Sequence, residues 1–196
     1  MGIFMPKNQV LEAIKSRRAI RNYEDKPVPE TAVEMMLEAA TYAPTAINLQ
    51  PWKFTIVTSK TEMKRLSDIA KPTLLRTLPD AGNPALAALK KSLSDPKYNV
   101  FYEAPLLIFV SAAPSRFGVY DCTMAAQNMM LAAYSLGIGS CWIGTAVGLA
   151  NDPKIKAELG IPDDHEVHAA VIFGYPKNGF PQSPPKHPAQ ILKRIA

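Results

Sequence analysis

Three arginines near the start of the chain are well suited to binding an anion. Arg17, Arg18 and Arg21 lie within five residues, directly after a segment with helical periodicity. Guanidinium groups hold phosphate through their charge and through forked hydrogen bonds. Asn48 and Gln50 follow in a proline-bounded loop over residues 43–52, and each amide can both donate to and accept from a polar ring. Together the two segments predict a site for a phosphorylated, heterocyclic cofactor.

Each of these segments also has a purely structural interpretation. Arginines after a helix complement its negative C-terminal end, and Asn or Gln before a strand commonly bonds to the nearby backbone. The glycines Gly137, Gly139 and Gly144 fit a helix cap and tight turn equally well as a close approach of the backbone to a flat ring. These alternatives stay open at the level of the sequence.

Other kinds of chemistry lack support. His165 and His168 lie in a turn before a predicted strand and belong to no HExxH pattern, and Cys122 and Cys141 are too far apart for a CxxC site. No P-loop and no GxSxG motif occurs. We therefore expect no metal site, and we assign no side chain as a catalytic acid, base or nucleophile.

Length and composition predict an ordinary globular chain. With 196 residues, of which 47% are hydrophobic and 20% charged, we expect one domain over residues 1–196. The net charge of +5 is scattered along the chain, whereas a nucleic-acid-binding protein would concentrate it in a patch. Because no apolar run could span a bilayer and residues 1–10 lack a signal pattern, we expect no membrane segment and a cytoplasmic location.

Periodicity and turn residues place the elements that must position these side chains. They predict helices over residues 8–16, 30–42, 62–70, 84–93, 120–136 and 152–159, and strands over residues 52–58, 105–112, 138–144 and 166–175. Residues 72–83, with two prolines, are expected to be irregular, and residues 176–188 to be extended. The apolar residues 191–195 should dock on the chain's own core or on a partner. Strands and helices that alternate unevenly predict an α+β fold.

Four segments, in this order, jointly resemble the FMN-dependent nitroreductase family. They are RRAIR at residues 17–21, APTAINLQPW at residues 43–52, AAQNMM leading to GIGSCWIG within residues 125–144, and FGYP at residues 173–176 followed by Pro185 and Lys186. Each motif is short, but their order and spacing are specific, and residues 58–103 contribute little.

The resemblance implies an α+β homodimer with intertwined chains, a central, mainly antiparallel sheet flanked by helices, and FMN at the dimer interface. It implies that the arginines surround the phosphate, the ribityl chain and the pyrimidine side of the flavin, and that the loop over residues 44–48 comes from the other subunit. It implies that residues 142–144 run beside the ring. Ala19 stands where many relatives have Ser, and Lys186 stands where relatives often have Arg, which forms a forked contact that Lys cannot form. The implied cofactor contacts are Arg17, Arg18, Ala19, Arg21, Pro44, Thr45, Ala46, Asn48, Trp142, Ile143, Gly144 and Lys186.

The implied activity is the transfer of two electrons from NADH or NADPH, through FMN, to a small oxidised organic acceptor of the nitroaromatic or quinone type, by a ping-pong mechanism. Arg21 is the candidate for stabilising the negative charge of the reduced ring. The alternative is a non-catalytic FMN-binding carrier or sensor, which would bind the flavin without being reduced by either nicotinamide.

Overall fold

The computed structural model describes residues 8–79 and 82–195 of the chain. Three short stretches lie outside the described residues. They are residues 1–7, which belong to the segment without a signal pattern, residues 80–81, which belong to the stretch expected to be irregular, and residue 196. Within the described part, four strands form a sheet in the order β1-β2-β4-β3, and every pairing is antiparallel. The α+β architecture with an antiparallel sheet is therefore confirmed. The strands are β1 Trp52–Val57, β2 Leu106–Ala112, β3 Gly139–Trp142 and β4 Glu166–Gly174.

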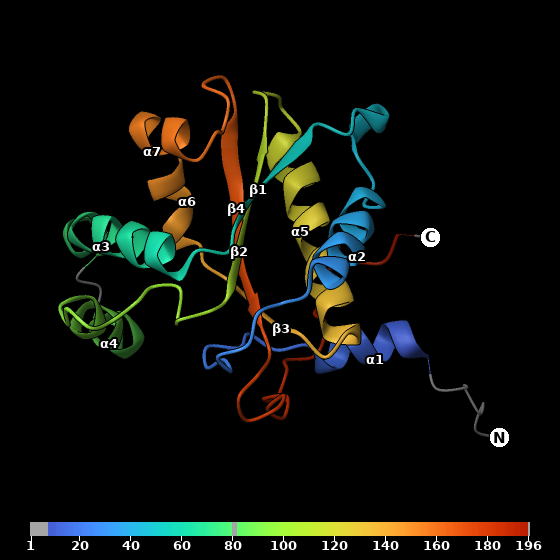
Figure 1. Ribbon diagram of the computed structural model, residues 1–196. Coiled ribbons are helices and arrows are strands. Elements are labelled where there is room, and N and C mark those ends of the chain that lie inside the picture. The colour runs from blue at the N-terminus through green and yellow to red at the C-terminus, as the bar shows by residue number, and fades with distance from the viewer. Residues whose placement is uncertain (1–7, 80–81, 196) are drawn as a thin grey trace.

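Helices cover both faces of this sheet (Figure 1). On one side lie α1 Gln9–Ser16, α2 Glu30–Thr41 and the long α5 Gly118–Ser135. On the other side lie α3 Lys60–Thr77, α4 Pro84–Leu93, α6 Thr145–Ala150 and α7 Pro153–Glu158. The short 3₁₀ helix η1, Ala46–Asn48, stands apart from both groups, between α2 and β1.

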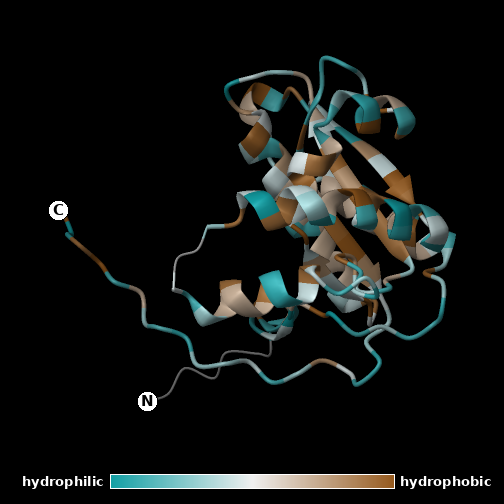
Figure 2. Cartoon of the chain, turned by 90° about the vertical axis from the view of Figure 1, so that its left-hand side faces the viewer, coloured by the Kyte–Doolittle hydropathy of each residue, from teal (hydrophilic) through white to brown (hydrophobic). Residues whose placement is uncertain are grey.

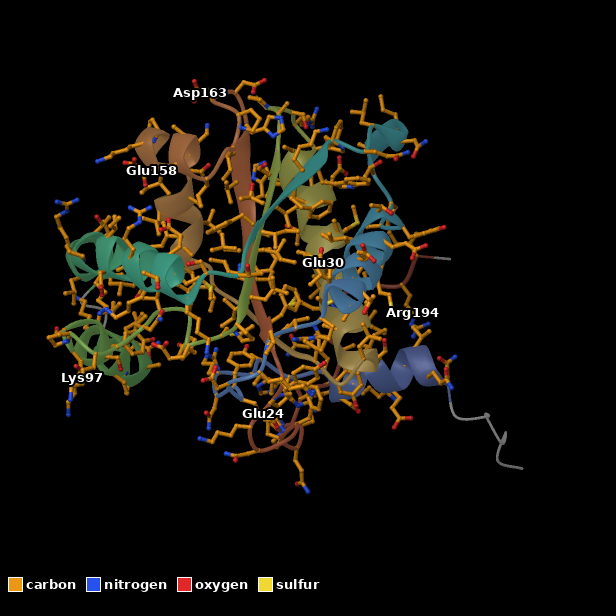
Figure 3. The ribbon with its side chains drawn as sticks, in the orientation of Figure 1. Glu24, Glu30, Lys97, Glu158, Asp163 and Arg194 are labelled. Atoms are coloured by element: carbon orange, nitrogen blue, oxygen red, sulfur yellow. The ribbon has the colours of Figure 1, made fainter. Side chains whose placement is uncertain are left out.

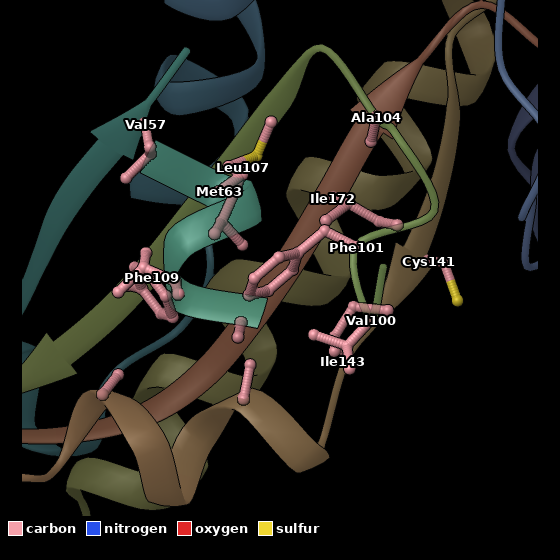
Figure 4. Close-up of a cluster of buried hydrophobic side chains, with 14 of the residues drawn as sticks. Val57, Met63, Val100, Phe101, Ala104, Leu107, Phe109, Cys141, Ile143 and Ile172 are labelled. Carbon is pink, nitrogen blue, oxygen red and sulfur yellow. The ribbon is translucent and has the colours of Figure 1, made fainter. Parts of the chain in front are cut away.

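The alternation of side chains along β2 divides the core between these two faces. All seven residues of β2 are buried; Leu107 and Phe109 pack with the cluster under α3 and α6, and Ile108 and Val110 with the cluster under α2 and α5. Successive side chains on a strand point to opposite faces, so a continuous apolar run is what a strand covered on both faces requires. Figure 4 shows the first cluster, in which Phe101 lies among side chains from several elements.

Polar caps fix the ends of several predicted helices. The Asn8 side chain accepts from the Leu11 amide at the start of α1, and Asp152 accepts from Lys154 and Ile155 at the start of α7. Gly137 has a φ of 73° directly after α5, which is the left-handed conformation expected of a helix-terminating glycine. The helix-cap interpretation of Gly137 is thus confirmed.

The prediction that the chain becomes irregular at Pro72 is wrong, because α3 continues through this residue to Thr77. Proline inside a helix lacks the amide that would donate to the fourth residue before it, which costs about 3 kcal/mol. Leu74, Leu75 and Leu78 lie beyond Pro72 and pack against the buried cluster. A well-buried leucine contributes roughly 1.5–3 kcal/mol, so three partly buried leucines can offset that cost. The six-residue helix α6 was not predicted either.

The surface and the tail complete the description. The charged residues labelled in Figure 3 lie around the outside of the molecule, which agrees with a scattered charge. Beyond Gly179 the tail has no helix or strand; its end extends away from the body (Figure 2), and Leu192 is 98% exposed. None of the described helices has the length and apolar character needed to cross a bilayer.

Candidate functional site

The arginine segment is held against the sheet by backbone pairing with β3. Ala19 and Ser140 form a parallel bridge, and the Ile20 amide donates to the Ser140 carbonyl oxygen at 2.9 Å. Ile20 is buried and lies directly over Gly139. The residues on either side of Ile20 are thereby fixed relative to the end of β3.

Four cationic residues meet at one cavity. Lys15 and the three predicted contacts Arg17, Arg18 and Lys186 line a space of about 900 Å³ together with Ala19, and residues 181–184 of the tail form its other wall. The Arg18 guanidinium donates to the Arg17 carbonyl oxygen, and its Nε is buried without a partner. No carboxylate in the described part of the chain forms an ion pair with these three side chains. The cavity therefore carries an uncompensated positive charge, which fits a phosphate dianion.

A second cavity, of about 370 Å³, lies beside the end of β3. Arg21 lines it together with Trp142, Ile143 and Gly144. The Ile143 amide already donates to the Ala170 carbonyl oxygen at 2.8 Å, whereas the Gly144 amide has no acceptor among the described residues. A side chain at Gly144 would make ordinary contacts with Trp142, so packing within the chain does not require glycine there.

Two tyrosines that the sequence did not reveal complete this second cavity. Tyr98 and Tyr102 line it, and the Tyr98 hydroxyl donates to the Tyr102 hydroxyl at 3.1 Å. Their rings meet edge to face with centroids 5.9 Å apart, and the Arg21 guanidinium lies 5.8 Å from the Tyr102 ring centroid. Burial, followed by this hydrogen bond, raises the pKa of Tyr98 above its usual range, so the Tyr98 hydroxyl stays protonated at neutral pH.

The turn that carries Tyr102 is strained and held by buried polar groups. Tyr102 and Glu103 both have a φ of 54°, a left-handed conformation that costs non-glycine residues about 1–3 kcal/mol each. The Ser67 hydroxyl accepts from the Val100 amide at 3.0 Å, and the Asn99 side chain accepts from the amide of Phe101 and donates to Glu103. A surrounding structure that enforces strain is common at functional sites. No periodicity in the sequence predicts such a turn, so the sequence analysis assigned no functional role to residues 58–103.

Neither cysteine is poised for nucleophilic chemistry. Cys141 lines the second cavity, but burial raises the pKa of its thiol, and the opposing charges of Arg21 and Arg17 do not reverse that shift. Burial, and to a lesser extent the Asp121 charge, raises the pKa of Cys122 to about 12. Thiols are nucleophiles as thiolates, so both side chains act as buried apolar groups.

The loop over residues 44–48 lies elsewhere in the chain. The Ala46 amide donates to Asp121 Oδ1 at 3.1 Å near the start of α5, and Figure 1 shows η1 at the opposite end of the molecule from α1 and β3. Pro44, Thr45, Ala46 and Asn48 line neither of the two cavities that contain the arginines. Within one chain, the loop and the arginines are not brought together.

This loop is nevertheless built to present side chains outward. Ile47, Asn48 and Gln50 have φ values of 45°, 58° and 48°. Asn48 is exposed, and its side-chain oxygen accepts from the Gln50 side chain at 2.9 Å. The Gln50 amide donates to the Thr45 hydroxyl. The local-bonding interpretation of Asn48 and Gln50 is therefore correct in part, because their side chains bond each other rather than the backbone.

Comparisons with known proteins agree with this geometry. The sequence profile of the Nitroreductase family matches residues 14–175. A putative NADH dehydrogenase/NAD(P)H nitroreductase of Archaeoglobus fulgidus is 34% identical over 170 residues, covering 87% of each chain. A nitrobenzene nitroreductase of Ectopseudomonas oleovorans is 28% identical, covering 91% of this chain and 92% of its own. The crystal structure of a nitroreductase with bound FMN from Bacteroides fragilis superposes with a TM-score of 0.81 at 32% identity, covering 97% of this chain and all of that one.

Proposed function

Since this chain belongs to the nitroreductase family, we propose that it is an FMN-dependent oxidoreductase that passes two electrons from NADH or NADPH to a small oxidised organic acceptor. The acceptor is of the nitroaromatic or quinone type. FMN supplies the two-electron chemistry. The chain's own residues bind and orient the flavin and determine what reaches it.

The observation that carries this proposal is the pair of cavities on either side of residues 17–21. Arg17, Arg18 and Lys186 provide uncompensated charge on one side, which suits the phosphate. On the other side, Arg21 and Gly144 line a space that suits the ring. The free Gly144 amide can donate to the ring edge, and Arg21 can favour negative charge on its pyrimidine side.

The site is completed by a second copy of the chain. Apolar residues are exposed on the sheet side that carries α1 and α5: Val10 is 66% and Tyr120 63% exposed. These side chains, together with the exposed Ile191 and Leu192 of the tail, offer apolar area that a second copy can cover. In the homodimer the loop over residues 44–48, with Asn48 exposed, contacts the flavin held mainly by the other chain.

The use of a single flavin ring supports a ping-pong order. Arg21 and Gly144 line the space that suits this ring, and both substrates need its exposed face. The two substrates therefore bind in turn.

Anaerobic stopped-flow spectroscopy in two halves tests this function. NADH or NADPH alone should bleach the flavin absorbance of the purified holoprotein, and a nitroaromatic or quinone added afterwards should restore it. If neither nicotinamide bleaches the flavin, the chain is instead a carrier or sensor that binds FMN without turnover. Bleaching without recovery by either acceptor class would retain the oxidoreductase and reject the proposed acceptors.

A further inference from the structure

A third cavity, which none of Arg17, Arg18 and Arg21 lines, lies between α3 and the pair α6 and α7. Its volume is about 570 Å³, larger than the cavity beside Gly144. These three helices cover the sheet face opposite to α1, α2 and α5 (Figure 1). The cavity is therefore remote from the surface that we assign to the second copy of the chain.

The floor of this cavity is apolar. Ile69 and Leu74 on α3 face Leu149 on α6 and Ile155 on α7 across it. Ile155 is 4% exposed, whereas Ile69 is 41% exposed, so part of the apolar surface meets solvent. Thr73 also lines the cavity, and a threonine hydroxyl can bond a polar group of an occupant. Predominantly apolar walls with a few polar groups are typical of small-molecule sites.

The charges at the rim are balanced. Arg65 and Lys154 carry two positive charges, and Asp152 and Glu158 carry two negative charges. Arg65 bonds both Glu158, at 2.6 Å, and Glu62, and Asp152 is engaged with backbone amides at the start of α7. With two charges of each sign the rim is neutral overall, and among the described rim side chains only Lys154 has no partner, so the lining favours a neutral occupant.

Gly148 lines this cavity and is itself exposed. It lies inside α6, where glycine is about 1 kcal/mol less favourable than alanine. Its φ is not positive, and a Cβ added there would meet nothing within 4 Å. Neither backbone conformation nor packing within the chain therefore requires glycine at this position on the cavity lining.

We propose that the cavity between α3 and α6–α7 is a second ligand site, which takes a small, neutral, mostly apolar molecule with one or two hydrogen-bonding groups, such as a phenol or an indole. Its position makes it a regulatory site. Thr145 lines both this cavity and the one beside Trp142, and α6 begins directly after Gly144. An occupant in contact with α6 therefore acts on the segment that we assign to the flavin ring.

Indole, titrated into the full-length holoprotein and followed by calorimetry, tests the site. We expect saturable binding at one site per chain, with Gly148→Leu weakening it at least tenfold because the leucine fills the cavity. Gly148→Ala is the matched control, since a methyl group leaves most of the space open, and its dissociation constant should stay within about threefold of the native value. Thr73→Leu fills the cavity from α3 and should also weaken binding. Because this change leaves α6 unaltered, it shows whether weaker binding to Gly148→Leu comes from misfolding of α6.

Two results would overturn the proposal. One is the absence of saturable binding to the native protein. The other is an indole affinity that both Gly148→Leu and Thr73→Leu leave unchanged, which would place the indole elsewhere. The regulatory role is read from the absorbance spectrum of bound FMN, which should shift as indole saturates the native protein and stay constant in Gly148→Leu. A spectrum that is constant in the native protein at saturation rejects that role.

Discussion

The side chain of Ile20 lies so close to Gly139 that a Cβ added at residue 139 would come within 2.6 Å of Ile20 Cγ1. The same two segments are joined by the hydrogen bond from the Ile20 amide to the Ser140 carbonyl oxygen. The arginines can flank the end of β3 because the strand has no side chain at this position. The glycine segment could be explained by a helix cap and tight turn or by a close approach of the backbone to a flat ring. Gly139 does allow a close approach, but the group that lies against it is the side chain of Ile20 in the same chain.

We therefore predict that Gly139→Ala separates the arginine segment from β3. Overpacking of this kind costs about 1–3 kcal/mol, and urea unfolding of the apoprotein should show this loss. FMN affinity should fall as well, because the arginines are displaced. Gly148→Ala, at a glycine with open space, should instead be neutral or stabilising. Native stability and FMN affinity in Gly139→Ala would contradict this account of the segment.

The cationic cavity makes a direct prediction about FMN affinity. Removing a charged hydrogen-bond partner costs about 1.5–3 kcal/mol, and each 1.4 kcal/mol is about tenfold in affinity. Arg17→Ala and Lys186→Ala should each raise the Kd for FMN about tenfold or more, as measured by fluorescence titration. Arg116→Ala removes an arginine that lies over the Phe117 ring, outside both cavities, and should change the Kd less than twofold. Equal effects of all three changes would mean that the phosphate binds elsewhere.

The sequence could predict the elements whose periodicity and caps are local. The buried run of β2 and the cap at Asp152 were readable, because burial on both faces and an N-terminal cap leave direct marks on residue type. The course of α3 beyond Pro72 was not readable, because the leucines that offset the proline pack against a buried cluster with members far away in the sequence.

The candidate site could likewise be predicted only in part. The anion-binding role of the arginines follows from their residue type. Tyr102 does not, since its place beside Arg21 depends on a strained turn held by Ser67 and Asn99. The separation of the loop over residues 44–48 from the arginines follows from topology, which no short motif encodes.

Complementation between variants tests the proposed sharing of the site. We expect Asn48→Ala and the double variant Arg17→Ala/Arg21→Ala each to form homodimers with two weakened FMN sites. A heterodimer of the two should have one intact site and one that is doubly damaged. Differently tagged chains can be co-expressed, purified as heterodimers and titrated with FMN. One high-affinity FMN per heterodimer is expected; two equally weakened sites, or a monomer that retains FMN fully, would refute the sharing.

The buried thiol of Cys122 predicts how stability depends on pH. Its pKa is raised from 9.0 to about 12, chiefly by burial, so the folded state keeps the thiol neutral while the unfolded state ionises. The stabilising contribution is complete below about pH 9 and is lost as the pH rises from about 9 towards 12.

Urea unfolding of the apoprotein between pH 7.5 and 10.5 measures this loss. Cys122→Ala should flatten the decline above pH 9 more than Cys141→Ala does, because the charges of Arg21 and Arg17 partly counteract the effect of burial on the pKa of Cys141. An unchanged decline in Cys122→Ala would show that other groups, such as the buried Tyr23, dominate.

The two tyrosines beside Arg21 can be separated by their places in one hydrogen bond. Tyr98 donates its hydrogen to the Tyr102 oxygen, which leaves the Tyr102 hydrogen available to a ligand in the cavity. Tyr102→Phe removes that donor, and a hydrogen bond contributes about 0.5–1.5 kcal/mol, so the Kd for FMN should rise roughly two- to tenfold. The reduction potential of the bound flavin should also fall, because a donor that favours the reduced, more negative ring is lost.

Tyr98→Phe leaves the Tyr102 hydroxyl in place and should change the Kd less than twofold. Because the raised pKa of Tyr98 keeps its hydroxyl protonated, these differences should be constant between pH 6 and 8. Potentiometric titration of the three holoproteins measures the potentials; equal potentials in the native protein and Tyr102→Phe would remove Tyr102 from the flavin site.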